Sequence, residues 1–132
     1  MSIAAYKRTI RESETPRQIE RRVLAQLTAR LEDAAQAYDT AATAPERIAI
    51  LAGGLRDALA ENVTVWLHFR YDLSSPANEL PPALRVQLIS LSLWIEKQTN
   101  RILGGGQGLV QLAAVNRSVV DGLAGRAPSP QA

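Results

Sequence analysis

Residues 66–82 read Trp-Leu-His-Phe-Arg-Tyr-Asp-Leu-Ser-Ser-Pro-Ala-Asn-Glu-Leu-Pro-Pro. This stretch joins two strongly apolar segments through a polar, proline-containing elbow at 73–82. Asp72, the serines and Asn78 are residues whose side chains bond nearby backbone groups and fix a loop. Leu73 and Leu80 are expected to anchor the elbow in the core, and the prolines that follow suit the start of a helix. The pattern predicts two helices joined by a rigid elbow, which favours recognition over chemistry.

Apolar periodicity and helix start signals extend this prediction to the rest of the chain. We expect an all-α, single-domain bundle of four main helices, at about 16–40, 45–72, 82–103 and 108–123. A short amino-terminal helix is expected at 3–11, where Ile3, Tyr6 and Ile10 keep helical spacing. The domain is predicted to span 1–124, with a disordered tail at 125–132.

Two groups of glycines interrupt the helical pattern. Gly53-Gly54 falls inside the second predicted helix, where a close crossing of another helix would explain it. The cluster from Gly104 to Gly108 is expected to be a flexible joint. It fails as a phosphate-binding loop, because Leu109-Val110 follows the last glycine in place of Lys-Ser/Thr and a helix precedes it.

The predicted core contains two asparagines. Asn62 lies on the apolar stripe of the second helix with Trp66 and Phe69, and Asn116 lies on that of the last helix. An unpaired amide in a core costs a few kcal/mol, so each must find a partner. We expect a structural polar network that fixes helix register. The residues assigned to the core or to structural roles are Asn62, Trp66, Phe69, Asp72, Leu80, Leu91 and Asn116.

The third helix is apolar on two sides. Leu84, Leu88, Leu91, Ile95 and Ile102 form its main stripe, and Val86, Ile89 and Leu93 form a second one with Trp94 on its flank. A helix of this kind is either central to a bundle or presents one side to a partner. The candidate partner-binding residues are Val86, Ile89, Leu93 and Trp94, together with Asn78 and Arg85 near the elbow.

Composition excludes several classes of function. The chain has 132 residues, no cysteine and one histidine, which excludes thiolate and multi-histidine metal sites. His68 and Asp72 are spaced i,i+4, but no nucleophile or oxyanion-hole motif accompanies them. We expect no enzyme activity, no metal, no cofactor and no small-molecule substrate. No signal peptide or membrane span is expected, so the protein is predicted to be cytoplasmic.

Spaced residues along nearly the whole chain carry a family resemblance. They are Ala58-Leu59, Asn62, Trp66, Phe69, Asp72-Leu73, Pro76, Asn78, Leu80-Pro81, Leu84-Arg85, Gln87 to Leu91, Trp94-Ile95, Thr99, Gly104, Asn116 and Gly122-Leu123. Ala5-Tyr6 and the Thr15-Pro16-Arg17 helix start add to them. The sequence thereby resembles the FlaF family of flagellar biosynthesis regulatory proteins of alphaproteobacteria. The glycine-rich cluster Gly104–Gly108 departs from the family pattern.

The resemblance implies a non-enzymatic role in flagellum biogenesis. The leading hypothesis is binding of flagellin, whose termini are amphipathic helices, by an export chaperone or adaptor that controls flagellin synthesis or secretion. One alternative is control of flagellin mRNA through the basic residues Lys7, Arg8, Arg11, Arg17, Arg21 and Arg22. Few stacking aromatics accompany these, and they also suit an ordinary solvated helix face. Another alternative is a scaffold that binds only the regulator FlbT.

Overall fold

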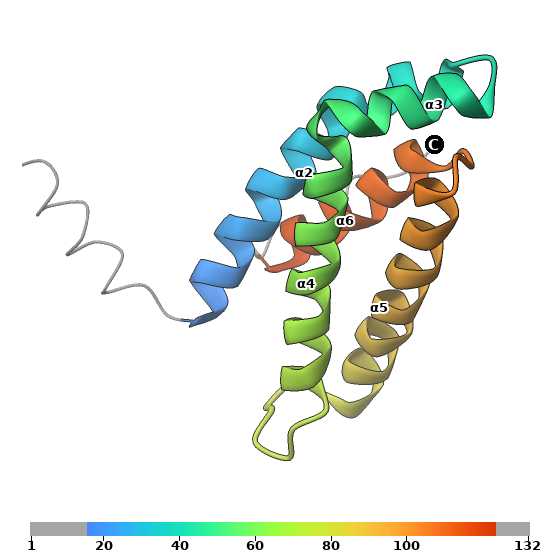
Figure 1. Ribbon diagram of the computed structural model, residues 1–132. Helices are drawn as coiled ribbons and strands as arrows, with labels where there is room; N and C mark the ends of the chain where they lie inside the picture. The colour runs from blue at the N-terminus through green and yellow to red at the C-terminus, as the bar shows by residue number, and fades with distance from the viewer. Residues whose placement is uncertain (1–15, 124–132) are drawn as a thin grey trace, which may run out of the picture.

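The computed structural model describes residues 16–123. The four longest helices in this range form two antiparallel pairs. In the first pair, the long helix α2 (Pro16–Thr40) lies against α6 (Leu109–Leu123). In the second, α4 (Arg56–Leu73) lies beside α5 (Pro82–Leu103), and the elbow joins them (Figure 1). The predicted all-α fold is confirmed, and residues 16–123 contain no strand. The expected helix at 3–11, the Thr15 start signal and the tail at 125–132 lie outside the described residues.

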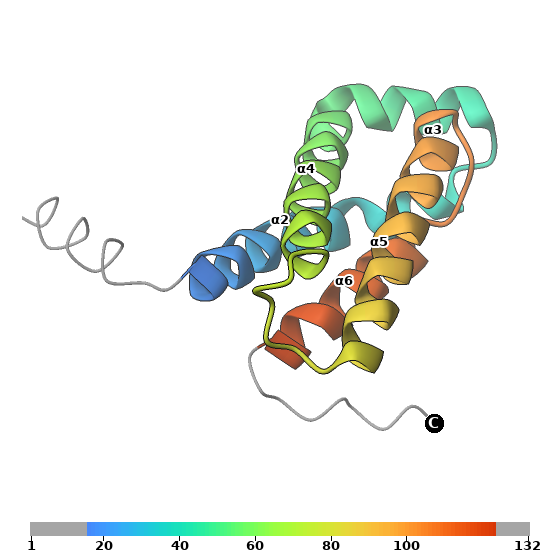
Figure 2. The ribbon, with the colours of Figure 1, turned by 90° about the horizontal axis from the view of Figure 1, so that it is seen from below.

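The second predicted helix is divided by a sharp bend. Thr43 caps α3 (Ala44–Ile50) by accepting a hydrogen bond from the Glu46 amide at 3.3 Å. A kinked turn, η1 (Leu51–Leu55), in which Gly53 and Gly54 leave helical φ/ψ, then leads into α4. Within this turn Gly54 has φ 105°, a conformation that side chains disfavour. The chain therefore changes direction between α3 and α4 (Figure 2).

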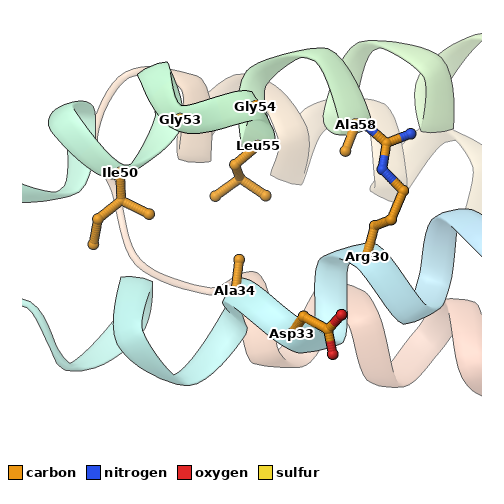
Figure 3. Close-up of a pocket in the computed structure, with 8 residues that line it drawn as sticks. All are labelled: Arg30, Asp33, Ala34, Ile50, Gly53, Gly54, Leu55 and Ala58. Atoms are coloured by element: carbon orange, nitrogen blue, oxygen red, sulfur yellow. The ribbon is translucent and has the colours of Figure 1, made fainter.

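The expected close helix crossing at Gly53-Gly54 is wrong. A methyl group added to either glycine would meet no atom within 4 Å. Glycine is needed at position 54 for its conformation, because the positive φ there turns the chain. A crevice of about 330 Å³ remains beside the bend. Figure 3 shows Ile50 and Leu55 from the bend and Ala34 from α2 facing each other across it.

A buried polar network ties three helices together. Asn116 of α6 accepts a hydrogen bond from the Trp66 indole of α4 at 3.0 Å. Its amide donates to the Asn62 side-chain oxygen of α4 at 2.7 Å and to the Thr28 hydroxyl of α2 at 3.2 Å. Thr28, Asn62 and Asn116 are each fully buried. The Nδ2 of Asn62 has no partner within residues 16–123.

The glycine-rich segment between α5 and α6 is held by many hydrogen bonds, which differs from the expected flexible joint. The buried Tyr38 hydroxyl lies 2.7 Å from the carbonyls of Ile102 and Gly106. Burial raises the pKa of Tyr38, so it remains a protonated donor. Arg47 donates to the Gly105 carbonyl at 2.6 Å. Gly108 has φ 118°, and a side chain there would collide with Gln98.

Replacing Gly54 with alanine should destabilise the protein by about 1–2 kcal/mol, because φ 105° is strained for any residue with a Cβ. Gly53→Ala is the matched control. Its φ is −84° and it has the same open surroundings, so it should be neutral or stabilise by up to about 1 kcal/mol. Urea unfolding followed by circular dichroism measures both. Equal effects of the two substitutions would contradict the conformational explanation.

Asn116→Leu should lower the free energy of unfolding by about 2–5 kcal/mol, because the Trp66 indole and the Asn62 carbonyl each lose a buried partner. Thr28→Val should cost about 1 kcal/mol, since Asn116 keeps its other two bonds. The same unfolding experiment compares them. A leucine variant as stable as the starting protein would show that the network contributes nothing.

Candidate protein-binding groove

A groove of about 810 Å³ lies between the first half of α5 and the last turns of α6. The two helices meet near the glycine-rich segment and diverge toward the elbow (Figure 1). Twelve residues from the elbow, α5 and α6 line the groove: Leu80, Leu84, Val86, Gln87, Leu88, Ser90, Leu91, Trp94, Ser118, Val119, Gly122 and Leu123.

The lining is apolar and carries no charge. Leu88 and Val119 are buried and belong to the hydrophobic core beneath it. Leu84 and Val86 remain 39% and 64% exposed, and Trp94 is half-buried. The only polar side chains in the lining are Gln87, Ser90 and Ser118. Such a surface binds an apolar partner through burial and shape, with a few hydroxyl and amide groups to orient it.

The α6 wall is anchored at both its beginning and its middle. The Asp39 carboxylate of α2 accepts hydrogen bonds from the amides of Gly108, Leu109 and Val110 at 2.8–3.0 Å. This caps amides at the start of α6 that have no partner within the helix. Further along, Asn116 is held in the polar network, and Arg117 pairs with Glu32 at 3.2 Å. The side-chain hydrogen bond to Glu32 raises the pKa of Arg117.

The α5 wall is held against α4. The Ser92 hydroxyl donates to the Trp66 carbonyl at 3.3 Å, and Arg70 pairs with Glu96 at 3.0 Å. The Gln98 amide donates to the Gly108 carbonyl at 3.1 Å. Both walls therefore belong to a connected scaffold, and the groove is preformed.

The elbow fixes one end of the groove. The Asn78 amide donates to the Asp72 carboxylate at 3.3 Å, and the Asn78 side-chain oxygen accepts from the Leu80 amide at 3.0 Å. These bonds place Leu80 in the groove lining. Arg85 is half-buried, and its Nε is buried without a hydrogen-bond partner among the described residues.

The proposed partner-binding residues separate onto two sides of α5. Val86 and Trp94 line the groove. Leu93 is 54% exposed and Ile89 packs partly against the core, but neither lines the groove. Of the residues assigned to core or structural roles, Asn62, Trp66, Phe69 and Asn116 are buried. Leu80 and Leu91 are half-buried in the groove lining, and Asp72 is exposed.

Sequence reasoning missed most of the groove. Leu84, Leu88 and Leu91 were assigned to the core stripe because their spacing is that of a buried face. Only the divergence of α6 leaves this face partly uncovered, and no local pattern reports divergence. The sequence analysis also did not single out two exposed apolar residues of α4 outside the groove, Leu67 and Tyr71, which are 42% and 82% exposed.

The candidate RNA-binding residues lie only partly within the described part of the chain. Arg21 and Arg22 are half-buried on α2. Lys7, Arg8, Arg11 and the side chain of Arg17 lie outside it. None of the helices within residues 16–123 combines the length and apolar character that a bilayer span needs.

The described residues thus define a small all-helical protein with an uncharged apolar groove. Among known protein families, residues 2–123 match the family described as flagellar protein FlaF, and the chain belongs to this family. The predicted resemblance is confirmed, and membership indicates a flagellum-related role. Comparison with curated proteins and with solved structures found no match.

Proposed function

We propose that this FlaF-family protein binds flagellin in the cytoplasm, as a non-enzymatic export chaperone or adaptor that controls flagellin synthesis or secretion. It holds one amphipathic terminal helix of flagellin in the α5–α6 groove and requires no cofactor. The observation that carries the proposal is the groove itself, which is apolar, uncharged and walled by two anchored helices.

The dimensions and chemistry of the groove support a helical ligand. Its volume of about 810 Å³ is in the range of pockets that enclose a substantial ligand. An amphipathic helix presents apolar side chains at i, i+3/i+4 and i+7, which matches a groove between two helices. Trp94 is the expected anchor, because a large aromatic side chain in a groove contributes much of the energy of such interfaces. Covering these flagellin residues would delay polymerisation before export.

A second apolar surface supports an additional adaptor role. Leu67 and Tyr71 of α4 and Leu93 of α5 are exposed outside the groove. The Ser92 hydroxyl bonds the Trp66 carbonyl, so the residues that follow them, Leu93 and Leu67, lie at similar heights on α5 and α4. This surface is the candidate site for a regulator of the FlbT type. The alternative, control of flagellin mRNA through Arg21, Arg22 and the basic residues before them, would use a different surface, since the groove lining provides no cation for phosphates.

Leu84→Asp should weaken flagellin binding at least tenfold, because it places a charge in the apolar groove. Leu67→Asp is the matched control. Leu67 has nearly the same exposure as Leu84, 42% against 39%, but lies on α4 outside the groove. The flagellin affinity of Leu67→Asp should therefore stay within about twofold of that of the starting protein. Isothermal titration of each purified full-length variant with monomeric flagellin measures the change.

Circular dichroism shows whether both variants remain folded. Trp94→Ala provides a second groove variant, with an expected loss of at least tenfold. Folded groove variants that bind flagellin as well as the starting protein would refute the groove assignment. Equal losses in the Leu84 and Leu67 variants would also refute it.

A further inference from the structure

We infer that Gly122 determines which helices the groove accepts: the bound helix packs its backbone closely against α6 at Gly122, and its own residue at that contact is small. The larger apolar side chains of the bound helix then face the α5 wall. The inference rests on the proposed function, because it describes how the flagellin helix lies in the same groove. It adds a requirement on the ligand sequence that an apolar lining alone does not impose.

Gly122 lies near the end of α6, is exposed and lines the groove. A methyl group added to it would meet no atom within 4 Å. The position therefore has free space beside it, on the side of α6 where a ligand would lie. Positive φ among the described glycines occurs only at Gly54, Gly105 and Gly108. Gly122 thus has a backbone conformation that alanine also adopts.

The presence of glycine at position 122 is a cost to the free protein. Within a helix glycine is less stable than alanine, because its unfolded chain has more conformational freedom to lose. Neither a special φ nor a close neighbour within residues 16–123 offsets this cost. A close contact made from outside the chain does offset it, since only glycine lets two helix backbones approach with no side chain between them.

The two walls of the groove differ in the side chains that they present. Ser118 lies one turn before Gly122 on the same face of α6, and it is also exposed in the lining. The larger Val119 of α6 is buried at the base. The α5 wall presents Leu84 and Trp94. A helix in the groove therefore meets a shallow surface along α6 and large apolar side chains along α5.

This asymmetry defines the class of ligand. Packed helices lie with their axes about 8–10 Å apart, and the side chains at the contact set the distance. Backbone contact at Gly122 requires glycine, alanine or serine at the facing position of the ligand, which also permits Cα–H···O contacts between the helices. The stretch from Leu84 to Trp94 is about 15 Å of helix, which corresponds to about three turns of ligand. The ligand is thus an amphipathic helix with an uncharged apolar face and a small residue on one edge of it.

Gly122→Ala distinguishes close packing from looser filling of the groove. In close packing the added methyl group lies between two backbones, so the affinity for monomeric flagellin should fall at least about fivefold. In looser filling the same methyl group only adds apolar surface, so the affinity would stay equal or rise. Gly122→Leu should weaken binding further, by at least about tenfold. Isothermal titration of the full-length variants with monomeric flagellin measures these changes.

Gly53→Ala is the matched control. An added methyl group at Gly53 also meets no atom within 4 Å, and its φ is −84°, but Gly53 lies outside the groove. This variant should bind flagellin with unchanged affinity. Both alanine variants should unfold at the same urea concentration as the starting protein or at a higher one. A loss of binding in Gly122→Ala then reports on the contact and not on damage to α6.

Each other outcome is decisive. Undiminished flagellin affinity in Gly122→Ala overturns the inference, and weak binding by Leu84→Asp in the same titrations would show that the proposed function still stands. An equal loss in Gly53→Ala also overturns the inference, as does a Gly122→Ala variant that unfolds at lower urea, because the glycine would then serve the fold itself. A starting protein that binds no flagellin refutes the proposed function, and the inference falls with it.

Discussion

The rest of the structure depends on the buried amide of Asn116. Its oxygen and nitrogen bond Trp66 and Asn62 of α4 and Thr28 of α2, all away from water. In a low-dielectric core such bonds are strong and their loss is costly, so only one rotation of α6 satisfies them. That rotation directs Val119, Gly122 and Leu123, one to two turns later, into the groove lining. Asn116 thus sets the geometry of the α6 wall, although it does not itself line the groove.

The groove exists because α5 is held at its two ends and along α4 while α6 diverges from it. At one end, Asp39, Tyr38, Gln98 and Arg47 bond the glycine-rich segment and fix where α6 begins. At the other end, the Asp72–Asn78 pair shapes the elbow and places Leu80. Between these points α5 follows α4 and α6 follows α2, and the two pairs separate. Where the pairs separate, some apolar side chains of α5 and α6 remain uncovered and line the groove.

Sequence reasoning predicted features that local chemistry determines. The helix starts at Thr43 and at Pro82 follow from capping and proline geometry, and α3 and α5 begin where they were predicted. Buried asparagines on apolar stripes predicted a polar network, although not the parts that Thr28 and the Trp66 indole play in it. The bend at Gly54 and the fixed glycine-rich segment were misread, because glycine marks either a close approach or a positive φ and composition does not distinguish them. The groove could not be predicted, since it arises because the consecutive helices α5 and α6 pack against different helices, α4 and α2, and diverge, and no local pattern reports that angle.

We propose that the α5–α6 groove is where this FlaF-family protein holds flagellin. The most direct measurement is an amide NMR titration of the full-length protein with monomeric flagellin. We expect the shifted or broadened signals between 16 and 123 to concentrate in residues 80–94 and 118–123, with little change around Leu67 and Tyr71. Perturbations centred on the outer face of α4, or no perturbation at saturating flagellin, would contradict it.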